Sequence, residues 1–558
     1  MSESTISRRV FLTRAGGLVL TLGATPLAGP AWAARKVDPY RRGGLWLSGD
    51  HHVHTCFSID GMYRIEEQVE NAVRSGLDFC VITDHGGPEH SRVMLSDAYP
   101  QLVAARRRFP QITVFQGLEW NIPAAEHGSI IVPPSDEEAK LVLDFQTQFD
   151  ARVSRGPGGR ASAGSAASGS ANPETSAAGA AAGSTSASAA PAAAAAIPKD
   201  APRSAAEAEA AAVAGVRYLQ QRSPGSLFFA NHPARRGLDS PHELRAWADA
   251  GPDVMRGFEG APGHGAAPLV GIPRGYYGET PGPRAHPSYP LHAYRTWGGY
   301  DYYVAQVGGL WDSLLGEGRA FYITANSDSH RYFGDRRETD RVAFRKLGYV
   351  PLTGRTKPYR HGDPLDPDED YPPGVYARTY VYSATRKPMD VLDGMRGGNM
   401  WTVLGGLVDG VELWVHDGHS AAPMGSTLLV APGAEVEVVL RVRPARAANL
   451  VGDRPVLHHV DLILGEILGP VPHRDTLHHP TARVVQAWPA GQGRRVDGWL
   501  EFRYRITGVR DSVFLRARGT NTDVVAPRLD PLKIDPWRDL WFYSNPVMVR
   551  VRPGEANG

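Results

Sequence analysis

Short apolar runs alternate with metal-ligand residues along the first 330 positions of this 558-residue chain. Seven of these runs have the length and composition of β-strands, and helical patterns separate several of them. The seven runs are Leu45–Ser48, Phe79–Thr83, Ile112–Gly117, Ser129–Val132, Leu227–Ala230, Arg256–Phe258 and Phe321–Ala325. Nearly every run ends in histidine, aspartate or glutamate, or begins close after one. This alternation predicts an α/β fold from Leu45 to about Val403.

The polar residues beside these runs form an ordered series of clusters. In chain order they are Asp50-His51-His52-Val53-His54 with Asp60, Thr83-Asp84-His85, Glu119, His127, Asn231-His232-Pro233 and Asn326-Ser327-Asp328-Ser329-His330. In a parallel barrel the carboxyl ends of the strands gather on one face, so we expect the clusters at one rim. So many imidazoles and carboxylates together are unfavourable without cations between them. A His-x-His motif alone is more often a surface pair, but the ordered series favours a metal centre.

Spacing within the clusters also suits metal ligation. Residues i and i+2 at a strand end point the same way, so His52 and His54 can bind one ion, and so can Asp328 and His330. A carboxylate such as Glu119 can bridge two ions through its two oxygens. Mixed imidazole and carboxylate ligands favour Zn, Mn or Fe.

The ordered clusters resemble the PHP (polymerase and histidinol phosphatase) superfamily over roughly residues 45 to 400. The resemblance implies a distorted (β/α)7 barrel that holds two or three divalent ions and hydrolyses phosphate esters through a hydroxide formed at the ions. It also implies three ligand sets, which are His52, His54, Glu119 and Asp328; Glu119, His127 and His232; and Asp60, His85 and His330. His51 departs from the family pattern, because an apolar residue often stands there. It is expected either to compete for metal or to face solvent.

Four further residues near the clusters are candidates for other roles. Arg235 could bind phosphate oxygens through its guanidinium group, although a solvated loop arginine is equally expected. His264 could protonate a leaving group, although an ordinary rim histidine is the commoner case. Arg378 is a weaker candidate for the site. Asp84 is expected to orient a metal ligand rather than to bind metal itself.

The α/β region contains an insertion and several predicted helices. Residues 155–202 include the Ala/Ser/Gly-rich stretch Ala161–Ala196, which we expect to be a disordered insertion within one domain. Helices are predicted from Ile65 to a stop at Gly76, from a Ser135/Glu138 capping box, over Ser204–Gln221 and over Pro388–Arg396.

The last 150 residues have a different character. Short β-type runs follow one another between Gly, Pro and Asp residues, with no helical pattern among them. The runs are Val411–Val415, Glu435–Val442, His458–Leu464, Leu500–Tyr504, Val513–Ala517 and Val547–Val551. They predict a smaller β-sandwich-like domain over residues 408–552.

Residues 1–33 resemble a bacterial twin-arginine (Tat) export signal. Arg8 and Arg9 precede a weakly apolar run from Gly16 to Ala28, and a small-x-small site ends at Ala33. The Tat translocase is therefore an expected partner, and the periplasm or the exterior is the expected location. The apolar run is too short for a stable membrane span.

Composition narrows the function classes further. The chain is 42% hydrophobic and 21% charged, as in soluble globular proteins, and its net charge is +1, from 60 basic and 59 acidic residues. A nucleic-acid partner is not expected, because such proteins usually carry a basic excess. Cys56 and Cys80 are too few for a disulfide framework, and we expect two buried thiols.

These observations favour an exported metal-dependent phosphoesterase that acts on a small-molecule phosphate mono- or diester. Another enzyme class stays open, namely a metal-dependent hydrolase that uses the same cluster on a non-phosphate ester or an amide. A cell-envelope binding protein is the alternative outside enzymes, with the β-domain recognising glycan or protein and the barrel serving as a metal-stapled scaffold.

Overall fold

The computed structural model describes residues 38–41, 43–153, 204–263, 285–287, 289–331, 341–352, 370–531 and 535–553. The predicted export signal, the predicted insertion at 155–202 and His264 all lie outside these residues. Among the helices that are described, none is long and apolar enough to cross a membrane.

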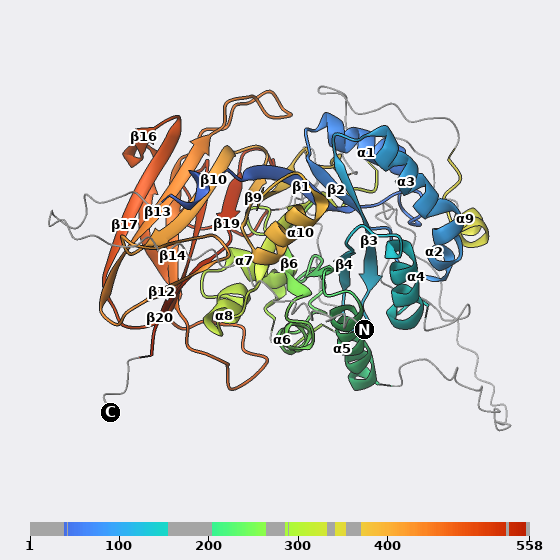
Figure 1. The fold of residues 1–558 in the computed structure, drawn as a ribbon, viewed down its shortest axis with the longest axis horizontal. Helices are drawn as coiled ribbons and strands as arrows, with labels where there is room; N and C mark the ends of the chain where they lie inside the picture. The colour runs from blue at the N-terminus through green and yellow to red at the C-terminus, as the bar shows by residue number, and fades with distance from the viewer. Residues whose placement is uncertain are drawn as a thin grey trace, which may run out of the picture.

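The fold is mixed α/β, with strands β1 to β7 in chain order within one large sheet. Figure 1 shows β1, β2 and β3 side by side in this sheet. Their bounds are β1 Leu45–Val53, β2 Phe79–Ile82, β3 Thr113–Asn121, β4 His127–Ile131, β5 Leu227–Ala230, β6 Met255–Pro262 and β7 Tyr322–Asn326. Each predicted run overlaps one of these strands, so the expected alternation is confirmed. Sequence reasoning missed β8 (Ala377–Ser383), which pairs antiparallel with β1.

Strand β4 runs antiparallel to both neighbours, whereas the sequence suggested parallel strands. Only residues 122–126 connect β3 to β4, and so short a connection makes a hairpin rather than a parallel crossover. The first residue of β4, His127, pairs with the last residue of β3, Asn121. The reversal therefore places the start of β4 at the edge where β3 ends.

The carboxyl ends of β1 and β7, the first and last of these seven strands, approach each other. An isolated parallel bridge joins Val53, the last residue of β1, to Ser329, just beyond β7. At β7 itself, the Ala325 amide donates to the Thr379 hydroxyl of β8 over 2.8 Å. The bridge therefore brings the cluster that contains His52 and His54 next to the cluster that contains Asp328, although the two are far apart in the sequence.

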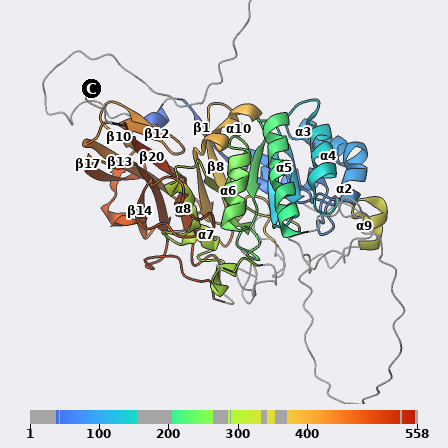
Figure 2. The ribbon, with the colours of Figure 1, turned by 90° about the horizontal axis from the view of Figure 1, so that it is seen from below.

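Helices pack along one side of these strands, and α3, α4 and α5 stand next to one another there (Figure 2). The helices are α1 Ile65–Arg74, α2 Pro88–Val93, α3 Tyr99–Arg108, α4 Glu138–Phe149, α5 Ala205–Arg222, α6 Pro241–Ala250, α7 Tyr302–Ala305, α8 Leu310–Gly316, α9 Arg341–Leu347 and α10 Pro388–Gly397. In α1, Ile65, Val69 and Ala72 are buried against alternate strand residues such as Cys80.

The other side of the strands forms a second buried cluster closed by α10. This cluster joins Val391, Leu392 and Met395 of α10 to strand residues that include Phe79 and Tyr322, both at the amino ends of their strands. Arg396 adds hydrogen bonds to the backbone carbonyls of Gly225 (2.6 Å) and Asp253 (2.7 Å). Helix α10 thus covers the amino ends of these strands, opposite the carboxyl ends that carry the polar clusters.

Three of the four predicted helices have the expected limits. Gly76, with φ of +76°, follows the end of α1, and the Ser204 hydroxyl caps α5 by accepting from the Glu207 amide. The Ser135/Glu138 capping box is wrong, because α4 begins at Glu138 without a side-chain cap. The Glu138 carboxylate instead binds the Arg106 guanidinium of α3 in a partly buried ion pair.

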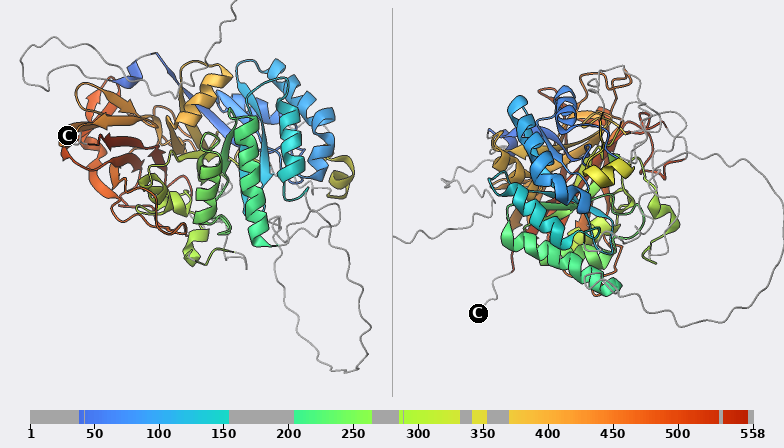
Figure 3. Two further views of the ribbon diagram at one scale, coloured as in Figure 1. Left: turned by 60° about the horizontal axis from the view of Figure 1, so that its bottom comes forward. Right: turned by 90° about the vertical axis from the view of Figure 1, so that its right-hand side faces the viewer.

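The C-terminal β region extends the large sheet and adds a five-stranded one. Its strands are β9 Met400–Leu404, β10 Val408–His416, β11 Ala421–Pro423, β12 Thr427–Val430, β13 Ala434–Pro444, β14 His459–Glu466, β15 Arg483–Pro489, β16 Arg494–Val496, β17 Trp499–Val509, β18 Val513–Thr520, β19 Trp541–Ser544 and β20 Val547–Val551. The second sheet has the order β11-β10-β13-β17-β16. The orange and red strands of this region occupy one end of the molecule (Figure 3).

The predicted boundary between residues 403 and 408 lies inside a continuous structure. Strand β9 pairs with β8 on one side and with β19 on the other, so one sheet runs through both predicted domains. A buried ion pair also joins them, since Arg516 of β18 donates to Asp312 of α8 over 2.7 and 2.8 Å. The C-terminal β region is thus firmly attached to the part of the chain that carries the polar clusters.

Candidate metal centre

His52 and His54 lie side by side at the carboxyl end of β1, where residues i and i+2 point the same way. The register of β1 against β2 shifts between Asp50 and Val53, and both imidazoles are fully buried. His52 Nε2 lies 3.1 Å from His54 Nε2. Asp328 Oδ1 lies 3.1 Å from His52 Nε2 and 3.2 Å from His54 Nε2, which brings clusters one and six into one group.

Glu119 occupies the middle of the centre and is 1% exposed. Its Oε1 lies 3.1 Å from His52 Nε2, 3.1 Å from His127 Nδ1 and 3.4 Å from His232 Nε2. Its Oε2 lies 3.3 Å from His54 Nε2 and 2.6 Å from His85 Nδ1. The first two ligand sets implied by the resemblance therefore meet at this one carboxylate.

The charge state of Glu119 follows from these neighbours. Burial alone would raise the pKa of the Glu119 carboxyl, because it removes water from the charged form. His127, His85 and His52 outweigh that effect and hold the pKa of Glu119 well below its usual range. The carboxylate is therefore charged at neutral pH and can serve as a ligand through both oxygens.

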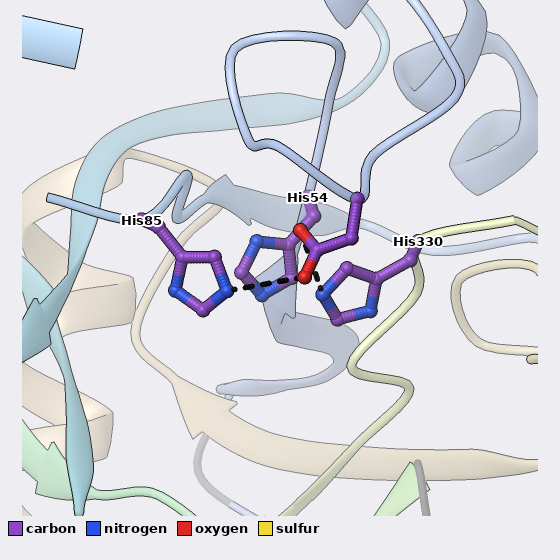
Figure 4. Close-up of side chains that lie close together, drawn as sticks. His54, His85 and His330 are labelled. Carbon is purple, nitrogen blue, oxygen red and sulfur yellow. Dashed lines mark ion pairs between the residues drawn. The ribbon is translucent and has the colours of Figure 1, made fainter. Parts of the chain in front are cut away.

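The third implied set gathers around Asp60. Its carboxylate oxygens lie 3.6 Å from His85 Nε2 and 3.6 Å from His330 Nε2. Figure 4 shows His85 and His330 on either side of this carboxylate, with His54 behind them. The rings of His54 and His330 stack with centroids 3.9 Å apart. All nine predicted metal ligands thus lie in one continuous group.

The residues present fit divalent ions by two criteria. The donors are imidazole nitrogens and carboxylate oxygens, which suit Zn, Mn or Fe. Within the described part of the chain, Glu119 Oε2, Asp60 Oδ1 and His127 Nδ1 are buried and make no hydrogen bond. Buried polar atoms almost always have a partner. Bound cations would supply one to each of these converging atoms.

Two ligands sit in backbone conformations that side chains rarely adopt. His232 has φ of +33° and Asp328 has φ of +50°. Left-handed conformations outside glycine cost free energy and concentrate at functional sites. From these positions the side chain of His232 lies toward Glu119, and that of Asp328 lies toward His52 and His54.

Asp84 positions His54, a predicted metal ligand, through hydrogen bonds. Its carboxylate accepts from the Thr55 amide and hydroxyl, both over 2.6 Å, and from the Ser58 hydroxyl over 2.8 Å. The Ser58 oxygen lies 2.8 Å from Nδ1 of His54. Asp84 therefore fixes the ring of His54 through Ser58, without reaching the metal-facing nitrogen.

Sequence reasoning missed three buried or partly buried carboxylates that support the centre. Glu259 of β6 lies 2.7 Å from His52 Nδ1 and accepts from the His232 amide over 3.0 Å. Asp370 lies 3.3 Å from His330 Nδ1. Glu126 lies 3.9 Å from His232 Nδ1 and forms, with His127 and His232, a further group of possible ligands. Glu259 directly follows a predicted strand, so the signal that identified the other clusters was present there.

His51 and Arg378 lie away from the metal-facing atoms. The His51 ring is buried rather than solvent-facing, bonds the Thr324 hydroxyl over 2.8 Å and stacks on Phe229. The expectation that it would compete for metal or face solvent is wrong, because the opposite side of β1 is also buried. Arg378 donates to the carbonyls of Ser75 (2.7 Å) and Gly374, so its guanidinium is used in holding backbone.

Two arginines place positive charge beside the ligands. Burial and the charge of Arg235 lower the pKa of His232 to about 3, which keeps this imidazole neutral. Burial opposes the charging of His85, and so does Arg152, which follows α4 and which sequence reasoning missed, but Glu119 and Asp60 outweigh both and raise the pKa of His85. Arg235 and Arg152 are thus candidates for contacts to an anionic substrate.

Comparison with known proteins places six of the nine ligands in a recognised segment. Residues 50–153 match the PHP domain. His52, His54, Asp60, His85, Glu119 and His127 fall inside the match. The other three predicted ligands, His232, Asp328 and His330, follow it in the chain and lie in the same group of side chains.

One relative and one solved structure are similar to parts of this chain. A probable phosphatase of Caldicellulosiruptor bescii is 37% identical over 101 residues, which is 18% of this chain and 40% of that protein. A Bacteroides vulgatus structure, described as a two-domain protein containing a predicted PHP-like metal-dependent phosphoesterase, is 14% identical. That alignment covers 88% of this chain and 95% of the other, with a TM-score of 0.33. The PHP match and the first relative support the PHP superfamily for this segment.

Proposed function

We propose that this protein is a metal-dependent phosphoesterase of the PHP superfamily that hydrolyses a small-molecule phosphate mono- or diester. The observation that carries the proposal is the position of Glu119. Its two oxygens lie within 3.4 Å of nitrogens from five histidines that belong to three ligand sets. A buried carboxylate shared in this way is suited to bridge two divalent ions.

The side chains have distinct tasks in this proposal. The nine ligands would hold two or three divalent ions of Zn, Mn or Fe. When bound, such ions neutralise phosphate charge and activate a water molecule for attack at phosphorus. Glu259, Asp84 and Asp370 fix the rings of His52, His54 and His330, so that the ligands are preorganised.

Arg235 and Arg152 would bind substrate. The charge of Arg235 acts on the predicted ligand His232, and the charge of Arg152 acts on the predicted ligand His85. A guanidinium can form two parallel hydrogen bonds to phosphate oxygens, which positions the ester for attack. His264 stays a candidate for protonating the leaving group.

Two finer features of the fold belong to the proposal as well. Strands β1 to β7, with Val53 bridged to Ser329, support a distorted (β/α)7 barrel closed near its catalytic rim. The two sheets of the C-terminal β region support a sandwich, since β10 contacts β19 and β20 across them. In a barrel of this kind the catalytic residues belong at the carboxyl ends of the strands.

We further propose that the Tat translocase exports the folded, metal-loaded protein to the periplasm or the exterior. The ligands come from separate strands, so the centre forms only on folding, and a route for folded proteins lets metal bind first. Replacing Arg8 and Arg9 by lysine should leave active, metal-containing protein in the cytoplasm, measured by cell fractionation. Normal periplasmic yield of that variant would exclude this route.

A substrate panel tests the catalytic proposal. Purified protein, stripped with chelator and reloaded with Zn, Mn or Fe, is assayed on aryl phosphate monoesters, aryl phosphate diesters, carboxyl esters and amides. We expect phosphate-ester hydrolysis that depends on added metal and fades in acid as the imidazoles are protonated. Hydrolysis confined to carboxyl esters or amides would support the other hydrolase class. Metal binding without any hydrolysis would support the binding protein.

A further inference from the structure

A second group of metal-ligand residues lies outside the Glu119 centre and shares no residue with it. His242 stands in the first turn of α6, His286 follows β6 in the chain, and Asp475 belongs to the loop between β14 and β15. One ligand atom from each lies within 4.8 Å of the other two. We propose that these three residues form a zinc site that fastens the C-terminal β region to α6.

The distances suit a zinc ion with little movement. Donor atoms about 2.0–2.1 Å from a tetrahedral zinc lie about 3.4 Å from one another. His286 Nε2 is 3.3 Å from Asp475 Oδ1, which already has this spacing. His242 Nδ1 is 2.5 Å from the same oxygen and must move apart by about 1 Å. Asp475 is 49% exposed, so a small rotation of its side chain can provide that space.

A fourth residue points to a metal ligand at His242 rather than to a simple ion pair. Glu209 of α5 places a carboxylate oxygen 3.7 Å from Nε2 of His242, the nitrogen on the other side of the ring from Asp475. Histidines that bind metal through one nitrogen usually present the other to a carboxylate or carbonyl. The ring of His242 therefore lies between two acidic groups, an arrangement that is common among histidines that bind metal.

Other contacts beside this site already hold the loop between β14 and β15 against α6. The fully buried Arg245 of α6 donates to the Arg474 carbonyl over 2.7 Å, and Arg474 pairs with Asp249 of α6 over 2.8 Å. The site thus rests on a formed interface, so little chain entropy is lost when an ion binds.

The third ligand ties this interface to the loop that follows β5. The His286 amide donates to the Gly237 carbonyl over 2.7 Å, and Gly237 lies five residues beyond His232. Imidazole and carboxylate ligands without a thiol suit zinc. Three protein ligands leave a fourth position for water. The zinc would therefore cross-link α6, the loop between β14 and β15 and the segment that contains His286, and a chelator could remove it.

Zinc content and hydrogen exchange test the proposal on the full-length protein. Zinc per chain is measured after stripping and dialysis against zinc chloride for wild type, Asp475→Asn and His242→Gln. The matched control is His473→Ala, which removes an exposed histidine from the same loop. We expect both site variants to hold one zinc fewer per chain than wild type and the control.

Exchange locates the missing ion. In wild type and in the control, zinc at 100 times its Kd should slow amide exchange in residues 467–482 by up to about 100-fold, because opening the loop must release the ion. In Asp475→Asn this protection should be lost. Unchanged zinc content in both site variants, or equal zinc-induced protection of the loop in Asp475→Asn, would overturn the site.

Discussion

At the scale of single residues, the strand-end rule identified side chains that the structure brings together, but it missed the carboxylates that support them. His52 and Asp328 were predictable because metal ligands of both kinds recur directly after apolar runs. Glu259 and Asp370 were missed because their role depends on contacts to His52 and His330 across the fold. His51 was misjudged because one strand can be buried on both sides, which alternation alone does not reveal.

Replacing Glu119 by glutamine should remove the negative charge that is proposed to bridge two ions, while the size and shape of the side chain stay nearly the same. We expect kcat to fall at least about a hundredfold, equivalent to roughly 3 kcal/mol of lost transition-state stabilisation. Unfolding by denaturant should change little by comparison. Glu137→Gln, at an exposed position before α4, is the control. Near-wild-type turnover with unchanged metal content would contradict the bridging role.

Replacing Asp84 by asparagine should act through His54 and not through substrate. The amide cannot accept all three of the hydrogen bonds from Thr55 and Ser58, so the ring of His54 loses its fixed orientation. We expect metal affinity to fall about 10- to 100-fold, while kcat at saturating metal falls less. Equal half-saturating metal concentrations for variant and wild type would refute this positioning role.

At the scale of elements, local signals succeeded where the chain decides structure by itself. The Ser204 cap of α5 and the Gly76 stop of α1 are set within a few residues. The start of α4 and the strands β8 and β9 were not predictable in this way. Glu138 is committed to Arg106, and β9 is defined by its pairing with β8 and β19.

In strand β17, the contribution of Glu501 to the free energy of unfolding should depend on pH. Arg441 and Arg503 each donate to Glu501 over 2.9 Å. Burial opposes the ionisation of Glu501, but Arg494, Arg441 and Arg503 outweigh burial and lower the pKa of Glu501 to about 2. A lowered folded-state pKa gives stability that is present above about pH 4.5 and lost as pH falls toward 2, up to about 3 kcal/mol. Glu501→Gln should therefore lose less stability than wild type between pH 4.5 and 2, measured by denaturant titration. Parallel curves would contradict this.

At the scale of the whole molecule, the sequence predicted a change from α/β to β structure but not the continuity between them. Composition indicates where helices cease, yet it carries no information on whether β9 joins strands on both sides. The buried pair of Arg516 and Asp312 shows the same limit, because its members are 204 residues apart.

Breaking that pair should destabilise the entire chain. Arg516→Met leaves the buried Asp312 carboxylate without its partner, at a cost of about 3–5 kcal/mol of unfolding free energy. The double variant with Asp312→Leu should recover part of that loss, because no buried charge is left. Denaturant unfolding, followed by tryptophan fluorescence, measures both. A single variant as stable as wild type would show that the pair contributes nothing to the attachment.

The central claim is that Glu119 bridges ions in a multi-metal centre, and anomalous X-ray diffraction from metal-loaded crystals tests it most directly. We expect at least two anomalous peaks about 3.5–4 Å apart, one on each side of the Glu119 carboxylate and each within bonding distance of its predicted histidines. A centre with no peak, or with a single ion that does not touch Glu119, would contradict the claim.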